Sequence, residues 1–212
     1  MPLIGVGLVL LLAVGTAVLL TRNDAPESTL HPGQDTLGDG DVAGSGTPAF
    51  RFTRPTRELV RTSPGRITPR KREASVRLAA SVREVLTDLY TEGFLDPANW
   101  KQGRYTDAFG GFTAGARKQA EARPGLLTAG LRAGDRYEQI LPVSGRLVTR
   151  ILLDRTGSPT LVVSMVRFSA EALGPEPVTL RSRGQFFFER LRGRWKIVSF
   201  HVTRTDTPLE SA

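Results

Sequence analysis

The chain has no cysteine and only two histidines among its 212 residues. The absence of cysteine excludes disulfide bonds, thiol nucleophiles and thiolate metal ligands together. His31 and His201 lie far apart, and no carboxylate-rich loop with calcium-ligand spacing occurs, so the pattern of a metal site is missing. Glycine-rich phosphate loops and the Gly-x-Ser-x-Gly motif are also missing. We therefore predict no metal site, no cofactor and no assigned catalytic residue.

Composition places the chain among ordinary globular proteins that carry an appendage. Apolar residues make up 40% of the chain and charged residues 24%, and a length of 212 residues suits one domain with an extension. The formal net charge is +8. This excess is concentrated in one short segment, which favours contact with anionic partners such as lipid headgroups.

Residues 3–20 form the longest apolar run and contain no charged side chain. As a helix this run would be about 27 Å long at 1.5 Å per residue, close to the roughly 30 Å hydrocarbon layer of a bilayer. A cleaved signal peptide is the alternative, but nothing basic precedes the run and bulky leucines occupy the expected cleavage region. We predict a transmembrane anchor over residues 1–21.

A linker is predicted for residues 22–72, with a basic arm at its end. Residues 22–50 combine glycine, proline, serine, threonine and aspartate with few large apolar residues, which is typical of unfolded segments. The basic arm, residues 51–72, has eight basic side chains and one acidic side chain. A solvated arm and an arm that binds an anionic membrane surface are both compatible with this charge. The surface-binding candidates are Arg51, Arg54, Arg57, Arg61, Arg66, Arg70, Lys71 and Arg72.

Three helices are predicted in the first half of the folded domain, residues 73–206. Thr68 and Pro69 are typical of a helix start, and apolar residues then recur at helical spacing until Gly93. Asp96 and Pro97 begin a second, short helix, and Thr113 begins a third that ends near residue 123.

Strand patterns replace helical patterns after residue 134. Candidate strands cover residues 138–153, 160–169, 178–190 and 194–205, separated by breaks short enough for hairpins. The strand at 160–169 is apolar on both faces, so we expect a sheet that is curved or partly covered on each side. Residues 207–212 are predicted to be a tail. The fold class is therefore α+β, with an N-terminal transmembrane helix and about three helices packed on a curved four-stranded antiparallel sheet.

The last hairpin, "FFFERLRGRWKIVSF", and the order of helices before a four-stranded meander resemble the nuclear-transport-factor-two-like (cystatin-like α+β) superfamily. Within it the chain resembles actinobacterial membrane-anchored proteins of the mammalian-cell-entry-associated type. The resemblance covers about residues 74–205 and implies a cone in which the sheet wraps a long helix and leaves a pocket. Members of this superfamily include enzymes, ligand binders and interaction modules, so the fold does not select a function.

His201 is the one imidazole available for chemistry in the predicted domain. Strict alternation along the last strand places His201 on the same face as Trp195. A general base needs an orienting partner, and Asp88, Tyr105 and Asp107 are polar residues that could face the same pocket. Asp88 and Asp107 are equally explained as solvated helix carboxylates. The pocket candidates are His201, Trp195, Tyr105 and Asp107, with a structural or surface role preferred for His201. In the run Phe186 to Phe188, core packing is preferred over base stacking for at least Phe186 and Phe188. The arginines near this run are Arg181, Arg183, Arg190, Arg192 and Arg194.

The predicted function is a single-pass membrane-anchored, non-catalytic binding or scaffolding module of a cell-envelope assembly. Its expected partners are the lipid bilayer and other membrane or envelope proteins, and nucleic acid is not favoured. A small pocket enzyme of hydrolase, isomerase or dehydratase type is the alternative, and anionic-polymer or lipid binding through the basic arm is a further one. The resemblance implies an extracytoplasmic C-terminal domain at the cell membrane, whereas Arg22 alone favours the opposite orientation by one charge.

Overall fold

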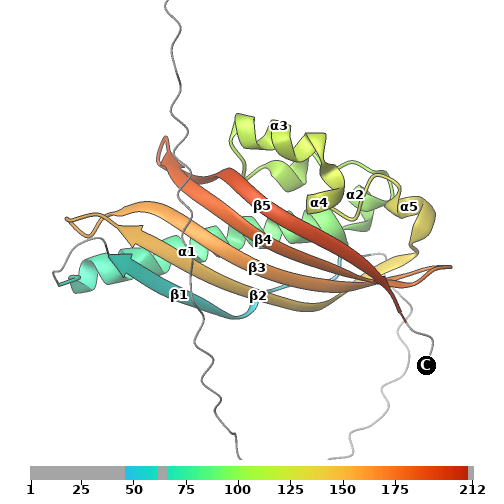
Figure 1. Cartoon of the computed structure of the whole chain (residues 1–212), viewed down its shortest axis with the longest axis horizontal. Coiled ribbons are helices and arrows are strands. Elements are labelled where there is room, and N and C mark those ends of the chain that lie inside the picture. Colours follow the sequence, from blue (N-terminus) through green and yellow to red (C-terminus); the bar gives the residue numbers. More distant parts are fainter. Residues whose placement is uncertain (1–45, 62–65, 210–212) are drawn as a thin grey trace, which may run out of the picture. The chain divides into compact units, whose positions relative to one another are not determined.

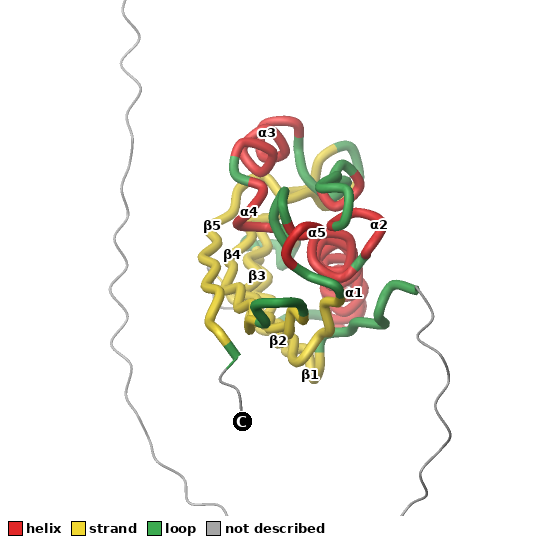
Figure 2. The backbone as a smooth tube through the Cα atoms, turned by 90° about the vertical axis from the view of Figure 1, so that its right-hand side faces the viewer, coloured by secondary structure: helices red, strands yellow, loops and turns green. Residues whose placement is uncertain are grey.

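A computed structural model describes residues 46–61 and 66–209, and these described residues belong to one compact unit. This unit has two layers, with the helices gathered on one face of a single sheet (Figures 1 and 2). No helix within the described ranges is both long and apolar enough to cross a membrane. The predicted anchor, and the predicted linker up to residue 45, lie outside the described residues.

The sheet has five strands in the order β1-β2-β3-β4-β5. These strands are β1 (Thr53–Arg61), β2 (Gln139–Leu153), β3 (Pro159–Leu173), β4 (Val178–Leu191) and β5 (Arg194–Pro208). Strands β2 to β5 form the predicted antiparallel meander, and β1 pairs parallel to β2. The predicted α+β class is confirmed, and the four strands of the meander occupy the predicted stretches, with β3 continuing four residues past its predicted end at residue 169. The β5 strand also takes in the first two residues of the predicted tail.

The fifth strand corrects the predicted sheet and the predicted end of the linker. Residues 53–61 of the basic arm form β1, because the segment carries apolar residues that the core accommodates. Phe50 and Phe52 are buried, and Leu59 packs against the core from β1. The Phe50 ring meets the Phe168 ring edge-on at 5.3 Å between centroids. It also covers Gly145, where an added Cβ would lie 2.6 Å from the Phe50 ring.

The long helix α1 (Pro69–Tyr90) lies along the inner face of the sheet (Figure 2). The Thr68 hydroxyl accepts a hydrogen bond from the Lys71 amide at 3.4 Å, and proline occupies the first turn, as predicted for this helix start. Its buried apolar side chains recur every three or four residues, so one stripe of the helix packs on the sheet. These side chains are Leu78, Val82, Leu86, Leu89 and Tyr90.

Shorter helices follow α1 and cover the far end of the sheet. A five-residue π-helical turn (Thr91–Leu95) leads into α2 (Pro97–Trp100), and a 3-10 turn (Asp107–Phe109) precedes α3 (Ala114–Ala122). Asp96 and Thr113 cap α2 and α3 with their side chains, as the sequence predicts. Two single-turn helices, α4 (Pro124–Leu127) and α5 (Ala133–Arg136), add to the three predicted ones.

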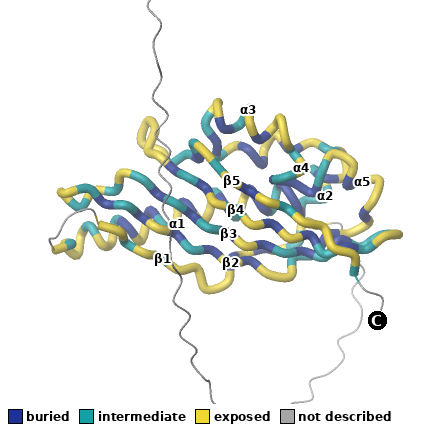
Figure 3. Tube along the Cα trace, in the orientation of Figure 1, coloured by how far each residue is buried: buried dark blue, intermediate teal, exposed yellow. Residues whose placement is uncertain are grey.

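Burial alternates along the central strands, so one face of the sheet is packed and the other is open (Figure 3). On the inner face Val162, Phe186 and Phe188 are fully buried, which confirms the predicted core role of the two phenylalanines. The opposite face, called the outer face below, carries the alternate residues of the same strands. No helix packs on this face in the described part of the chain (Figures 1 and 2).

Candidate functional site

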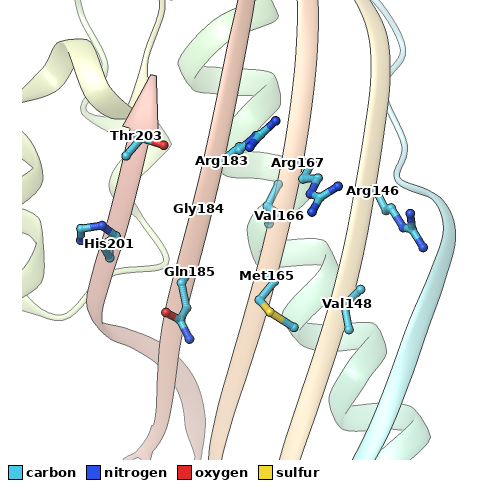
Figure 4. A pocket seen from close by; sticks show the side chains of 10 residues that line it. All are labelled: Arg146, Val148, Met165, Val166, Arg167, Arg183, Gly184, Gln185, His201 and Thr203. Atoms are coloured by element: carbon cyan, nitrogen blue, oxygen red, sulfur yellow. The ribbon is translucent and has the colours of Figure 1, made fainter. Parts of the chain in front are cut away.

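The outer face contains a shallow pocket of about 530 Å³ that extends across β2, β3, β4 and β5. Side chains from all four strands line it (Figure 4). Neighbouring strands lie about 4.8 Å apart, so the side chains of several strands meet in this pocket. The lining residues are Arg146, Val148, Met165, Val166, Arg167, Arg183, Gly184, Gln185, His201 and Thr203.

Three arginines lie directly opposite one another across the middle of this pocket. Arg146 on β2 pairs with Arg167 on β3, and Arg167 pairs with Arg183 on β4. Figure 4 shows the three side chains at one level on three neighbouring strands. We call these residues the arginine row. The register brings their Cα atoms within about 10 Å of one another, twice the spacing of adjacent strands.

The charges of the arginine row are not neutralised by the described residues of this protein. All three side chains are exposed, and among residues 46–61 and 66–209 none of them has an ion pair or a side-chain hydrogen bond. Arginine remains protonated in proteins, and like charges directly opposite in a sheet destabilise it. The folded state therefore carries an unfavourable electrostatic term at this position.

A neighbouring arginine shows the contrasting arrangement. Arg150, on the same face of β2, donates from Nε to Glu58 Oε2 at 2.6 Å, so its charge is paired across the β1–β2 ladder. Within the described ranges the arginine row has no such carboxylate. On β3 the acidic residue that shares its face is Glu171, four residues and about 13 Å along the strand from Arg167.

A set of half-buried apolar side chains adjoins the arginine row on the outer face. Val148 pairs with Met165 in the next row of the sheet, and Val163 pairs with Phe187 in the row after that. Apolar side chains in such positions bury surface when a partner covers them. We call this set the apolar strip; it consists of Val148, Leu152, Leu161, Val163, Met165 and Phe187.

His201 lies on the outer face of β5, opposite Gln185, and is exposed. The predicted alternation that places it beside Trp195 is wrong. Phe187 pairs with Ser199 whereas Phe188 pairs with Ile197, so one extra residue in β5 forms a bulge. The bulge reverses the faces, and Trp195 packs against the core whereas His201 faces outward.

The remaining pocket candidates lie elsewhere, so the structure does not bring the four together. Tyr105 is buried beneath the helices and donates its hydroxyl to Gly130 O at 2.7 Å. Burial raises the pKa of Tyr105 to about 12. Asp107 is exposed at the start of the 3-10 turn. Neither residue has a contact with His201 among those the structure shows.

The basic arm is partly incorporated into the domain. Arg51, Arg54 and Arg61 are exposed on or beside β1, and Arg57 is half-buried with Nη1 3.4 Å from the Arg72 carbonyl. Lys71 donates to the Thr156 carbonyl in the β2–β3 turn. Arg66, Arg70 and Arg72 are exposed.

Sequence reasoning did not identify the arginine row as a unit. In the sequence, Arg183 is one of several arginines near Phe186, and no motif marks Arg146 or Arg167 as a binding residue. Each lies in an alternating strand, and only the strand register places the three together.

No group of three or more histidine, aspartate or glutamate side chains arranged to hold a metal occurs within the described ranges. Comparison with the models of known protein families, with curated proteins and with solved structures found no match to this chain.

Proposed function

We propose that this protein is a single-pass membrane-anchored, non-catalytic binding or scaffolding module of a cell-envelope assembly. Its folded domain is of the nuclear-transport-factor-two-like type, as the resemblance suggests. The anchor is residues 1–21, and the domain lies on the extracytoplasmic side of the cell membrane. The order of helices before the meander, and the packing of α1 along the inner face, support the choice of fold family.

The arginine row is the observation that carries a binding function. It concentrates in one pocket positive charge that no residue of the described part of the chain pairs, and the fold accepts the repulsion between the three side chains. Such a cost is explained when a ligand or partner supplies the missing negative charge. The outer face is therefore proposed as the binding surface of the module.

The pocket-enzyme alternative receives less support from the same geometry. It requires His201, Tyr105 and Asp107 around one cavity, and these residues lie on different sides of the sheet or at the surface. Where the last turn of α1 meets the sheet, the Tyr90 ring packs against the rings of Phe168 and Phe186. Tyr90 and Phe94 stack there with centroids 5.5 Å apart.

A reporter fused after Ala212 tests the membrane proposal. Alkaline phosphatase is active only outside the cytoplasm, whereas green fluorescent protein exported by the general secretory route is not fluorescent. We expect active phosphatase fusions, dark fluorescent-protein fusions, and full-length chain that stays in the membrane pellet after alkaline carbonate extraction. Release of the intact chain by carbonate, or a mature chain that begins after residue 20, would overturn the anchor.

A further inference from the structure

We propose that the outer face is a docking surface for the anionic phospholipids of the bilayer, with the arginine row on the phosphate groups and the apolar strip toward the acyl region. This inference rests on the proposed membrane anchor and names the ligand of the binding surface. It differs from lipid binding through the basic arm, because it places the contact on β2, β3 and β4.

Charge complementarity supports an anionic partner. The arginine row presents three planar guanidinium groups on neighbouring strands, each able to bind a phosphate through two hydrogen bonds. Arg181 adds a fourth positive charge two residues before Arg183 on the same face of β4. Gln185 and Thr203 line the pocket beside the row and offer further hydrogen-bond donors.

The apolar strip distinguishes an amphiphile from a fully hydrophilic anion. Val148 and Met165 line the same pocket as the arginine row, and Val163 and Phe187 continue the strip in the next row. A phosphate-rich polymer would leave these side chains half-exposed. A phospholipid surface offers phosphate groups to the arginines and hydrocarbon to the strip, so it satisfies both halves of the face.

The absence of cysteine allows a single reporter on this face. Ser199 is exposed and pairs with Phe187 beside the apolar strip, so Ser199→Cys carries an environment-sensitive fluorophore. The labelled full chain is reconstituted in nanodiscs of phosphatidylcholine alone, or of phosphatidylcholine with a minor share of phosphatidylglycerol. We expect a blue shift of the emission only in the discs that contain phosphatidylglycerol, and its loss at high salt.

Two matched variants test which arginines are needed for the blue shift of the emission. The row variant carries Arg146→Gln, Arg167→Gln and Arg183→Gln, and the arm variant carries Arg51→Gln, Arg54→Gln and Arg61→Gln. We expect the row variant to lose most of the shift and the arm variant to keep it. Because the row substitutions remove like-charge repulsion, the row variant is expected to melt at or above the parent temperature. Should it fail to fold, Arg167→Gln alone is expected to lose at least half of the shift.

Each outcome decides the inference. Equal emission in the two kinds of disc, or equal loss in both variants, would overturn it and leave the membrane anchor standing. A chain that does not enter phosphatidylcholine discs would overturn the anchor and the inference together. Soluble glycerol phosphate or an acidic peptide that reproduces the shift in phosphatidylcholine discs would replace the bilayer with a free anion or a protein partner.

Discussion

Arg204 and Asp206 on β5 are joined by two parallel hydrogen bonds, 2.8 Å from Nε to Oδ1 and 2.7 Å from Nη2 to Oδ2. The Arg204 side chain is only 9% exposed, and its Nη1 also donates to the carbonyls of Gly125 and Thr128. One guanidinium therefore ties the edge strand of the sheet to α4. Asp206 thus neutralises the charge of Arg204, whereas the three arginines of the arginine row have no ion pair with any residue that the structure describes.

Replacing Arg204 by lysine tests this structural role. A single ammonium cannot reproduce the two parallel bonds and also reach both carbonyls, so Arg204→Lys is expected to lower the free energy of unfolding by about 2–3 kcal/mol. Urea denaturation measures the change. Arg132→Lys is the control, because its pair with Asp135 is exposed on both sides and is expected to contribute less than about 0.5 kcal/mol. Similar losses in the two variants would contradict the assignment.

Removal of the hydroxyl group is expected to affect the stability of the protein differently at two buried tyrosines. Tyr90 Oη lies 3.1 Å from Ser182 Oγ in the core, whereas the buried Tyr137 hydroxyl has no hydrogen-bond partner within the described residues. Tyr90→Phe is expected to destabilise the protein by about 1 kcal/mol because Ser182 loses its partner. Tyr137→Phe is expected to be neutral or stabilising by up to about 1 kcal/mol. Thermal unfolding of the two variants compares them, and a larger loss at Tyr137 would refute the prediction.

One residue of the β4–β5 turn can be replaced to raise the free energy of unfolding. Arg192 and Gly193 connect the strands with φ angles of 49° and 83°, the left-handed conformation of a type I′ turn. Asparagine adopts this conformation more readily than arginine, so Arg192→Asn is expected to raise the free energy of unfolding by about 0.5 kcal/mol. Chemical denaturation would show a higher midpoint with an unchanged slope. A lower midpoint would mean that the Arg192 side chain makes a contact that outweighs the backbone effect.

Alkaline pH is expected to destabilise the domain through its buried tyrosines. Burial raises the pKa of Tyr105 from 10.0 to about 12, and burial also raises the pKa of Tyr90. A group with a raised pKa in the folded state stabilises the fold below its unfolded pKa and loses that contribution as pH rises through the folded value. The contribution of Tyr105 to the free energy of unfolding is therefore constant below pH 10 and decreases between pH 10 and about 12. Tyr105→Phe is expected to flatten part of that fall, and an unchanged pH profile would contradict it.

Helix starts were predictable because their chemistry is local. Thr68, Asp96 and Thr113 each accept a hydrogen bond from the first turn that follows, and each is recognisable from its own residue and its neighbours. The meander was predictable because alternation and short polar breaks also act over a few residues. The strand β1 was not predictable, because its segment has the composition of a solvated basic arm. The burial of Phe50 and Phe52 just before it depends on contacts with Phe168 and Gly145, which lie far along the chain.

The candidate site depended on register, which the sequence does not display. One extra residue in β5 places His201 and Trp195 on opposite faces of the strand. No residue type near this bulge predicts the bulge from the sequence. The arginine row likewise exists because three strands place Arg146, Arg167 and Arg183 at one level. Each of these arginines alone reads as a solvated surface residue.

Arginine footprinting of the full chain tests most directly whether the outer face is the contact surface. Phenylglyoxal modification, read residue by residue by mass spectrometry, is compared between native membranes and the protein purified in a neutral detergent. We predict that Arg146, Arg167 and Arg183 are protected in membranes, whereas the exposed Arg123 and Arg192 react equally in both states. Equal reactivity of the arginine row in membranes and in detergent would contradict the account.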